Sequence, residues 1–513
     1  MTQSDNHSGR QAVMLDGLLG GITAISRVGE PAPGQTVSMV TSDSREVTPG
    51  ALFVAIRGYS LDGHRFISAA IKLGAVAVVT EELPPDVARG VIYIVVADSR
   101  RALAEASRLF FESASDRLMI VGVTGTNGKT TTARLITAML NACGIPAGYI
   151  GTNLCIIGDR KIPLDRTTPE AHGLHALFGQ MVDAGCRAAV MEVSSHALML
   201  QRVYGIGFSV ALFTNLSMEH LDFHGTMQEY ALAKERLFDQ LTPDGFAVFN
   251  ADDPMAGQMA ERVPPERRFL CTMQGGVLPD VACRSQLKAE IISETLESST
   301  IRLHFPDRQV MMDVGLPGAF NVMNVLEAAA TGFGLGLAPD DICRALAEVS
   351  AVDGRMERVG RTASGAHLFV DYAHTPDALF KALGALRALK PEGGRLVVVF
   401  GCGGNRDRSK RPEMGRIASE VADEVIITSD NPRDEDPEAI LDEICSGIRR
   451  GRCRRVTDRA EAIGEAVQLL REGDVLLVAG KGHEKYQEIS GRKEYFSDQD
   501  QLRKHMQEKE CGR

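Results

Sequence analysis

The chain has 513 residues, of which 44% are hydrophobic and 24% are charged, a composition typical of globular proteins rather than disordered ones. Its length suggests two to four domains with enough chain to bury several cores. The formal net charge is −11, from 56 Lys plus Arg against 67 Asp plus Glu. This balance argues against general binding to nucleic acids or anionic membranes, while a local basic pocket remains compatible with it.

Cysteine spacing and the N-terminus indicate the compartment. The ten cysteines include no Cys-x-x-Cys pair, which argues against a zinc site or a disulfide framework and fits a reducing environment. The first ten residues are polar and lack the apolar core of a signal peptide, and no apolar run approaches membrane-spanning length. We therefore expect a cytoplasmic protein without membrane insertion.

The first hundred residues predict a small α/β domain, residues 1–99. Short β-type runs cover residues 37–40, 52–56, 75–79 and 91–96, and a helical pattern covers residues 66–73. Polar loops follow two of these runs, at residues 41–45, which include Ser44, and at residues 58–64. Such loops suit ligand contact, but taken alone these residues favour turn and cap chemistry.

A second domain, residues 100–352, opens with a helical pattern at residues 100–111 and then an apolar run that ends in a glycine-rich turn. A helical pattern follows the turn. Free backbone N–H groups and the positive end of a helix dipole then point at one spot, which favours an anion. Five residues separate Gly122 from the Gly-Lys-Thr, one more than in the common P-loop. A chance Gly-Lys-Thr is the alternative, but the combination predicts an ATP site at Gly125, Thr126, Asn127, Gly128, Lys129, Thr130 and Thr131.

Within that site, Lys129 is placed to reach a phosphate and the Thr130 hydroxyl to hold magnesium. A buried-type strand at residues 188–191 ends in Glu192. Because an acidic residue at the end of a strand beside a P-loop strand is suited to bind magnesium, we predict that role for Glu192, against the alternative of a solvated loop residue. The next strand, residues 208–214, leads to two histidines and two carboxylates, either metal ligands or structural residues.

Two further helices are predicted in this domain. The first covers residues 229–241 with apolar residues on one side; Lys234 lies among them, and a surface lysine is the simplest interpretation from the pattern alone. An irregular stretch with extra strands, residues 260–310, precedes the second helix. That helix carries Asn321 and Asn324 one turn apart, suited to pair with an adenine edge or to cap the helix.

The third domain, residues 353–513, begins after a linker at residues 352–357. Apolar runs at residues 368–371, 395–400, 425–428 and 474–479 each break into a polar loop, which predicts an open parallel sheet with ligand at the carboxyl ends of its strands. One loop carries the cations Arg406, Arg408, Lys410 and Arg411 and predicts an anion site. The basic run at residues 449–455 is interpreted as a solvated face. The pattern thus predicts a three-domain α/β enzyme that uses ATP and an anionic second substrate.

An ordered series of motifs along nearly the whole chain resembles the Mur ligase family. It comprises Thr-Gly-Thr-Asn-Gly-Lys-Thr-Thr, Glu-Val-Ser-Ser-His, Asn-Leu-x-x-x-His-Leu-Asp-x-His, Asp-Tyr-Ala-His-Thr-Pro-Asp-Ala-Leu, Gly-Cys-Gly-Gly-x-Arg-Asp, Lys-Arg-Pro, Asp-Asn-Pro-Arg and Ala-Gly-Lys-Gly-His-Glu. The resemblance implies a small UDP-binding α/β domain, a central P-loop ATPase-like domain with a mostly parallel sheet, and a C-terminal Rossmann-like domain.

The resemblance also implies an activity, that of the branch which adds meso-diaminopimelate to UDP-MurNAc-L-Ala-D-Glu in peptidoglycan precursor synthesis. ATP phosphorylates the substrate carboxylate, and the amine then displaces phosphate from the acyl phosphate. The family's catalytic residues correspond to Lys129, Lys234 and His220. Its Mg²⁺ ligands correspond to Thr130, Glu192, His220 and a carbamylated Lys234, which reverses the surface interpretation because carbamylation needs the neutral amine that burial favours. A monomer is expected.

The same resemblance assigns substrate contacts. For UDP-MurNAc-dipeptide these are Ser44, Thr167, Thr168, Ser194 and Arg202. Leu200 stands where relatives often have a polar contact, so that contact is not expected here, and Glu219 replaces a usual aspartate before His220. The nucleotide contacts outside the loop correspond to Asn324, Arg355, Asp371 and His374.

Arg433 is expected to choose the amino acid. Diaminopimelate differs from lysine by a distal carboxylate, which a guanidinium binds bidentately, while an unpaired buried arginine would disfavour lysine. The residues expected to bind diaminopimelate are Arg406, Asp430, Asn431, Pro432, Arg433, Gly480 and Glu484. Two alternatives are a folylpolyglutamate synthetase, which would not need Arg433, and a P-loop switch or motor, which would need none of Lys234, His220 and Arg433.

Overall fold

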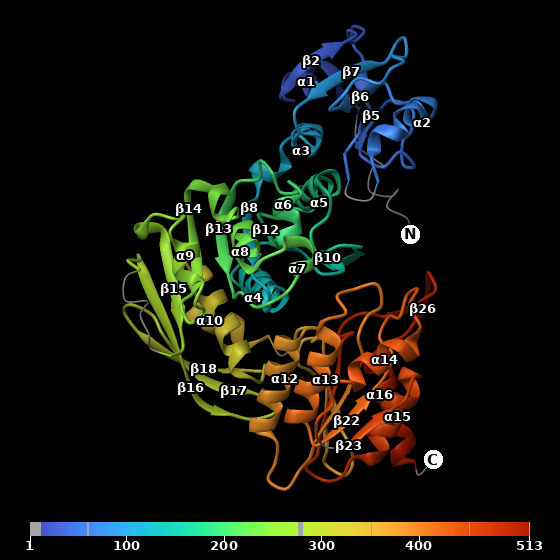
Figure 1. Cartoon of the computed structure of the whole chain (residues 1–513). Helices are drawn as coiled ribbons and strands as arrows, with labels where there is room; N and C mark the ends of the chain where they lie inside the picture. Colours follow the sequence, from blue (N-terminus) through green and yellow to red (C-terminus); the bar gives the residue numbers. More distant parts are fainter. Residues whose placement is uncertain (1–11, 59–60, 275–280, 350, 451, 512–513) are drawn as a thin grey trace. The chain divides into compact units, whose positions relative to one another are not determined.

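The structure is a computed structural model that describes residues 12–58, 61–274, 281–349, 351–450 and 452–511 (Figure 1). The polar first ten residues and two residues of the 58–64 loop lie outside these ranges. The chain forms two compact units: Met1–Thr124, Gly144–Leu212 and Leu232–Ala247 make the first, and Gly125–Cys143, Phe213–Ala231 and Val248–Arg513 the second. Among the described residues, every helix is too short or too polar to cross a membrane.

A five-stranded sheet organises the N-terminal part of the first unit, in the order β2-β7-β6-β5-β4. Strands β4 to β7 are parallel and β2 pairs antiparallel with β7. Alternating strand residues pack on α1 and α3 through one face and on α2 through the other. The elements are β1 (Val13–Met14), α1 (Leu15–Gly20), β2 (Ala24–Val28), β3 (Thr36–Val37), β4 (Met39–Thr41), β5 (Ala51–Val54), η2 (Gly63–Phe66), α2 (Ile67–Lys72), β6 (Ala77–Thr80), β7 (Ile92–Val96) and α3 (Ser99–Phe110).

The middle of the first unit holds the strands that end near the predicted chemistry. β8 (Met119–Thr124) lies beside β12 (Ala188–Glu192), and β12 lies beside β9 (Ala147–Gly151), all parallel. β10 (Leu154–Ile157) and β11 (Arg160–Pro163) extend this sheet as an antiparallel hairpin. The remaining helices of this region are η3 (Ala114–Arg117), α5 (Ala171–Asp183) and α6 (Ser195–Met199). β13 (Phe208–Phe213), α8 (Met227–Glu235) and β14 (Leu241–Asn250) contain residues of both units.

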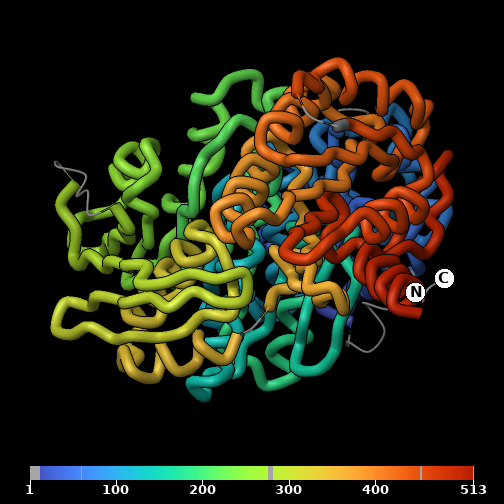
Figure 2. Tube along the Cα trace, turned by 90° about the horizontal axis from the view of Figure 1, so that it is seen from below, coloured from blue at the N-terminus to red at the C-terminus, as the bar shows by residue number. Residues whose placement is uncertain are grey.

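The second unit begins with α4 (Lys129–Ala142), which packs against α10 (Ala319–Gly334). The stretch predicted to be irregular forms the strands β15 to β18, of which β16 to β18 make an antiparallel meander, drawn in yellow-green in Figure 2. The elements of this region are α7 (Leu221–His224), η4 (Phe238–Gln240, in the first unit), α9 (Ala256–Ala260), η5 (Pro265–Arg267), β15 (Arg268–Thr272), β16 (Ser285–Glu294), β17 (Ser299–His304), β18 (Gln309–Val314) and α11 (Pro339–Ala347).

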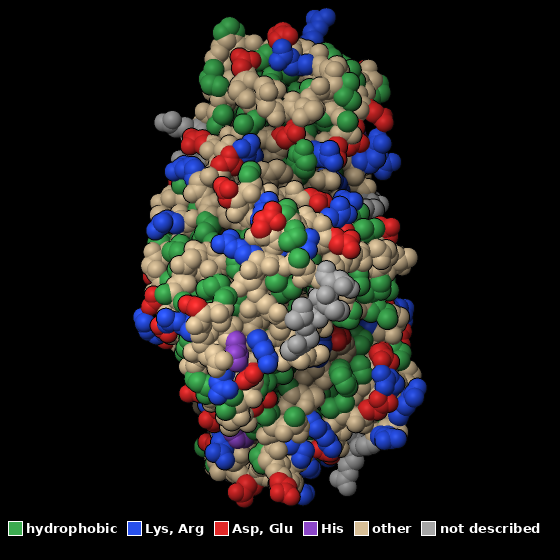
Figure 3. All heavy atoms as spheres, turned by 90° about the vertical axis from the view of Figure 1, so that its left-hand side faces the viewer, with side chains coloured by type: hydrophobic (Ala, Val, Ile, Leu, Met, Phe, Trp, Pro, Cys, Tyr) green, Lys and Arg blue, Asp and Glu red, His purple; other side chains and the backbone are tan. Residues whose placement is uncertain are grey.

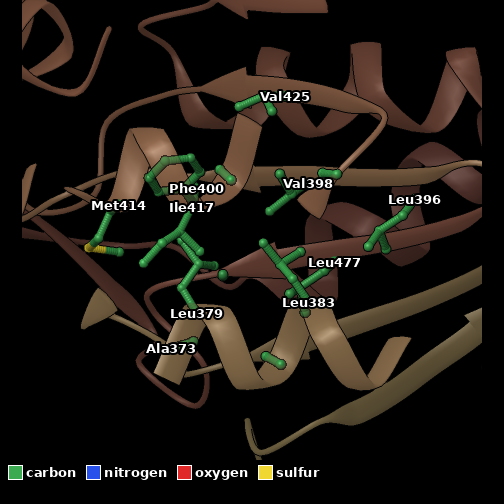
Figure 4. Packing of buried hydrophobic residues seen from close by; sticks show 14 of the residues in the cluster. Ala373, Leu379, Leu383, Leu396, Val398, Phe400, Met414, Ile417, Val425 and Leu477 are labelled. Atoms are coloured by element: carbon green, nitrogen blue, oxygen red, sulfur yellow. The ribbon is translucent and has the colours of Figure 1, made fainter. Parts of the chain in front are cut away.

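A six-stranded sheet in the order β19-β20-β24-β21-β22-β23 forms the C-terminal part, parallel except for β19. Alternate residues of each strand pack on α12 to α14 through one face, as Figure 4 shows for Val398 and Phe400, and on α15 and α16 through the other. The elements are β19 (Glu357–Arg361), β20 (His367–Asp371), α12 (Pro376–Leu389), β21 (Leu396–Phe400), α13 (Lys410–Val421), β22 (Glu424–Ile427), α14 (Pro437–Cys445), β23 (Arg452–Arg455), α15 (Arg459–Leu469), β24 (Val475–Ala479), β25 (Tyr486–Ile489), β26 (Arg492–Tyr495) and α16 (Asp498–Glu510).

One predicted helix is wrong at its end. The helix expected over residues 229–241 is α8, which stops at Glu235 and is followed by a short 3-10 turn and then by β14 from Leu241. Leu237 and Phe238 are buried after the helix has ended, so their apolar spacing predicted a longer helix than the chain forms. The basic run at residues 449–455 is exposed where it is described, as expected, and contributes the edge strand β23. On the face drawn in Figure 3, acidic and basic side chains are interspersed.

Candidate active site

The predicted glycine loop connects β8 to α4, and two of its glycines are required by its backbone. Gly125 and Gly128 have φ of +142° and +87°, which side-chain-bearing residues rarely adopt. A Cβ at Gly128 would also lie 2.6 Å from Asn324 Oδ1. These backbone conformations close the turn directly before α4, whose N-terminal end favours an anion.

Side chains of the segment after β13 hold this loop. Asn215 Oδ1 accepts from the Asn127 N–H at 3.0 Å, and Thr214 Oγ1 donates to the Asn127 carbonyl at 2.6 Å. Lys129 Nζ donates to the carbonyls of Gly125 at 3.0 Å and Thr126 at 2.8 Å. The ammonium thus lies along the loop, where phosphate oxygens would meet it.

All four residues predicted to contact nucleotide from outside the loop, Asn324, Arg355, Asp371 and His374, lie in the same unit as the loop. Arg355 donates to Thr130 Oγ1 at 2.8 Å, and its guanidinium lies 4.7 Å from the centre of the Tyr372 ring. Asp371 accepts from the Met356 N–H at 2.6 Å, and burial raises the pKa of this carboxyl. Asp377, which was not predicted, accepts from Asn127 Nδ2 at 2.7 Å. The linker and the β20 loop therefore reach the glycine loop within one unit.

Glu219 links two histidines. Its carboxylate lies 3.7 Å from His220 Nε2 and 3.6 Å from His374 Nε2. Burial acts to raise the pKa of this carboxyl, but His374, His220 and Lys129 outweigh it and hold the pKa well below its usual range. His374 Nδ1 lies 2.8 Å from the Tyr372 carbonyl oxygen, which orients the ring. Sequence reasoning noted Glu219 only as a mild replacement, because nothing local signals a partner in another domain.

Glu192 is fully buried, so the solvated-loop interpretation is wrong. Its carboxylate accepts from Tyr149 Oη at 2.6 Å and from the Thr152 N–H at 3.0 Å. These donors fix a hard oxygen ligand at the end of β12, which is the donor chemistry that Mg²⁺ prefers. Among the described residues no group of three or more His, Cys, Asp or Glu side chains is arranged to hold a metal.

Four of the five residues predicted to bind UDP-MurNAc-dipeptide, all except Ser44, lie together in the first unit. Thr168 Oγ1 donates to the Glu192 carbonyl at 2.9 Å and accepts from the Ser194 N–H at 3.2 Å. Arg202 Nη1 donates to the Thr168 carbonyl at 3.1 Å, and Thr167 Oγ1 lies 3.3 Å from a Thr152 hydroxyl. Burial lowers the pKa of Arg202, which also pairs with Glu170. Ser44 lies in the loop after β4, and Leu200 follows α6.

Lys234 is 1% exposed, so the surface interpretation of this lysine is wrong. Its helix neighbours Ala231, Ala233 and Glu235 are buried with it. A buried ammonium is costly unless it is paired, whereas a neutral or modified amine is not. His220, on the preceding segment, has left-handed backbone, and its half-exposed ring lies 6.1 Å from that of Tyr230.

The loops after β22 and β24 form one hydrogen-bonded group. Fully buried Lys481 donates to Asn431 Oδ1 at 2.9 Å, and Asn431 Nδ2 donates to Glu484 Oε2 at 3.0 Å. Gly480 has φ of +114°, and a Cβ there would lie 2.5 Å from Asp430 Oδ2. The predicted residues Asp430, Asn431, Gly480 and Glu484 are thus brought together. Lys481, the cation between them, was not predicted.

Arg433 is paired within the protein. Its Nη1 donates to the Gly404 carbonyl at 2.7 Å, and its Nε lies 3.4 Å from Glu488 Oε2. The backbone of Arg433 also accepts from and donates to the β25 hairpin, through Ser490 and Glu488. Pro432 lies between these anchors, and Arg406 is exposed beside the same loop.

The four-cation anion site predicted in the β21 loop is wrong in two members. Arg411 is fully buried and pairs with Glu435 at 2.9 Å and Glu443 at 2.8 Å. Arg408 also pairs with Glu443. These protein carboxylates occupy both guanidinium groups, which leaves Arg406 and Lys410 as the cations toward a ligand; Lys410 donates to the His374 carbonyl at 2.8 Å.

Models of the Mur ligase family match three stretches of the chain. Residues 36–111 match the Mur ligase family catalytic domain, residues 123–332 the Mur ligase middle domain, and residues 354–482 the Mur ligase glutamate ligase domain. The chain is 60% identical over 501 residues to the UDP-N-acetylmuramoyl-L-alanyl-D-glutamate–2,6-diaminopimelate ligase of Chlorobium phaeobacteroides, with 97% of this chain and 98% of that protein covered.

Solved structures match as well. A UDP-N-acetylmuramoyl-L-alanyl-D-glutamate–2,6-diaminopimelate ligase is 32% identical, with a TM-score of 0.66 and coverage of 94% of this chain and 98% of that one. The MurF ligase of Thermotoga maritima in complex with ADP shares the fold at 20% identity, with a TM-score of 0.62 and coverage of 93% and 98%. The chain therefore belongs to the Mur ligase family and has its three-domain α/β fold.

Proposed function

We propose that the chain is a cytoplasmic, monomeric ligase that uses ATP to add meso-diaminopimelate to UDP-MurNAc-L-Ala-D-Glu in peptidoglycan precursor synthesis. The observation that carries the proposal is 60% identity across 97% of the chain to a ligase of that name. Residues 1–99 bind the UDP moiety, residues 100–352 bind ATP, and residues 353–513 bind the amino acid. The Asp430–Arg433 loop supports the choice of amino acid.

ATP is bound as a substrate on the glycine loop. The phosphates lie at the N-terminal end of α4, and Lys129 moves from the loop carbonyls to the β- and γ-phosphates. Asn324, Arg355, Asp371 and His374 hold the rest of the nucleotide. The substrate carboxylate then attacks the γ-phosphorus, forming a C–O–P bond while the bond to ADP breaks. The amine of diaminopimelate next attacks the acyl carbon, and phosphate leaves.

Mg²⁺, when bound, neutralises the phosphate charge that develops during transfer. Thr130 and Glu192 would hold one ion, because they offer hydroxyl and carboxylate oxygens. His220 and a carbamylated Lys234 would hold the other. For Lys234 the burial of the side chain supports the proposal, since carbamylation turns an amine that is costly to bury charged into an anionic oxygen ligand.

Arg433 selects diaminopimelate by exchanging one carboxylate partner for another. Its guanidinium is paired with Glu488 at 3.4 Å. The distal carboxylate of diaminopimelate would take bidentate contact with Arg433 in place of this long pair, whereas lysine offers nothing in exchange. Glu484, already held by Asn431, would accept from the amine at the same end of the amino acid.

The test compares diaminopimelate with lysine as acceptor. Wild type should use diaminopimelate with a kcat/KM at least about a hundredfold above that for lysine, and Arg433→Ala should lose about a hundredfold with diaminopimelate while changing little with lysine. Arg492→Ala, at an exposed arginine of the adjoining β25–β26 hairpin, is the matched control. Equal use of both amino acids by wild type would contradict the assignment.

A further inference from the structure

A buried row of polar side chains lies behind the glycine loop, and the nucleotide contacts do not account for all of it. It consists of Asn321, Asn324 and Glu327 on α10 and Thr132 on α4, here called the α10 relay. All four are buried, Thr132 and Glu327 completely. Thr132 Oγ1 lies 3.2 Å from Asn324 Oδ1 and 2.9 Å from Glu327 Oε2. Asn324 Nδ2 lies 3.2 Å from Asn321 Oδ1, and Asn321 Nδ2 lies 2.8 Å from the Pro317 carbonyl.

The direction of each hydrogen bond follows from the last atom in the row. The Pro317 carbonyl can only accept, so Asn321 must turn its Nδ2 toward it. Its Oδ1 then faces Asn324, which must answer with Nδ2. Asn324 therefore presents Oδ1, an acceptor, to Thr132. Thr132 has one hydroxyl proton, and this proton must go to Asn324.

Glu327 must then be the donor at the other end. If Glu327 were ionised, its Oε2 and Asn324 Oδ1 would compete for the single Thr132 proton, and one buried acceptor would stay unpaired. A protonated Glu327 donates to Thr132 Oγ1, and every bond in the row is made. Glu327 Oε1 has no hydrogen-bond partner within the part of the chain that the structure describes, as suits the desolvated carbonyl of a neutral acid.

The surroundings favour the same state. Burial raises the pKa of Glu327 to about 8; the Thr132 bond opposes this rise, and the charge of Asp253 adds to it. From β15, Cys271 also faces Glu327, and burial raises the pKa of its thiol well above the usual range, so it adds no charge near pH 8. These are the titratable groups that act on Glu327 from the neighbouring elements.

We propose that Glu327 is a protonated positioning residue: it donates to Thr132, which therefore donates its own proton to Asn324 and holds the Asn324 amide against Gly128 of the nucleotide loop. The proposal rests on the proposed role of Asn324 in nucleotide binding. A Cβ added at Gly128 would lie only 2.6 Å from Asn324 Oδ1, so the amide and the loop backbone are tightly fitted. Ionisation of Glu327 takes the Thr132 proton from Asn324 and loosens this fit.

Infrared spectroscopy tests the proton directly. Wild type at about pH 7 should show a carbonyl band of a protonated carboxyl that disappears as the pH rises through about 8. The band should be missing from Glu327→Gln and present in Glu348→Gln. The latter makes the same change at an exposed glutamate directly after α11. Identical spectra of wild type and Glu327→Gln at about pH 7 would overturn the proposal.

Calorimetric binding of ADP tests the positioning role. Glutamine keeps a donor for Thr132 and never ionises, so Glu327→Gln should match wild type at about pH 7. Between about pH 7 and about pH 9.5, wild type should lose about tenfold more affinity than Glu327→Gln, the effect expected for one lost hydrogen bond. Parallel pH profiles of the two proteins would refute the relay. If neither protein bound ADP at either pH, the proposed function would be refuted instead. The infrared band would still show whether Glu327 is protonated.

Discussion

Lys234 shows what burial adds to a residue-scale argument. The sequence pattern alone places this lysine on an amphipathic helix, where a solvated ammonium is the ordinary outcome. The structure buries it with its helix neighbours, where a charged amine is costly. Carbamylation, as proposed, would turn this lysine into an oxygen ligand for the metal that the proposed phosphoryl transfer needs.

For Lys234 we predict that Lys234→Ala abolishes ligase activity and that short carboxylic acids such as formate or acetate partly restore it. The added acid would occupy the space of the missing carbamate and offer the same oxygen ligands. Steady-state rates with and without about 100 mM acid check this, at a concentration typical of weak ligands with Kd in the millimolar range or above. Lys72→Ala, an exposed lysine near the end of α2, should behave as wild type. Full activity of Lys234→Ala without added acid would show that the lysine has no role in catalysis.

The roles of other residues could be predicted only where the neighbouring sequence indicates them. Gly125 and Gly128 were predictable, since a strand, a turn and a helix start leave few backbone paths between them. The Glu219–His374 and Arg433–Glu488 contacts were not predictable, because each joins segments far apart in the chain and no spacing signals them. Arg408 and Arg411 were misassigned for the same reason: their carboxylate partners lie on other elements.

At the scale of elements, buried parallel strands were the easiest to predict. β20, β21, β22 and β24 begin and end within one residue of their predicted apolar runs, because strands covered on both faces are apolar throughout. The end of α8 was missed because its apolar spacing continues into the following 3-10 turn. The loops that follow the C-terminal strands lie where the expected open sheet places them.

Two of these loops are anchored by a buried ion pair. Arg459 at the start of α15 donates to Asp498 at the start of α16 through two bonds of 2.8 Å, and both side chains are fully buried. The same guanidinium donates to the carbonyl of Ser429 at 3.3 Å and to that of Ala479 at 2.9 Å. These carbonyls directly precede Asp430 and Gly480, so the pair sets the positions of both loops that are proposed to bind the amino acid.

We therefore predict that Arg459→Met destabilises the protein by about 3–5 kcal/mol, because it leaves a buried carboxylate unpaired. Arg387→Ala removes the exposed pair with Asp423 and should cost no more than about 1 kcal/mol. Chemical denaturation measures both losses of stability. Circular dichroism can follow the unfolding, because the chain has no tryptophan for fluorescence. Similar losses in the two variants would show that the buried pair is not an anchor.

At the scale of the whole molecule, the family could be identified from the order of motifs before any fold was known. No single motif was sufficient, because a glycine loop alone also fits a switch or a motor. The structure adds that the glycine loop, the His220 segment and the C-terminal loops belong to one compact unit, whereas Glu192, Lys234 and the dipeptide-binding residues belong to the other.

The proposed enzyme consumes ATP only to join UDP-MurNAc-L-Ala-D-Glu to meso-diaminopimelate. The most direct measurement is phosphate release from ATP with UDP-MurNAc-L-Ala-D-Glu alone, with meso-diaminopimelate alone, with both, and with lysine in place of diaminopimelate. Release should be rapid only when UDP-MurNAc-L-Ala-D-Glu and diaminopimelate are both present. Sustained phosphate release from ATP alone, or equal phosphate release with lysine, would contradict the proposed function.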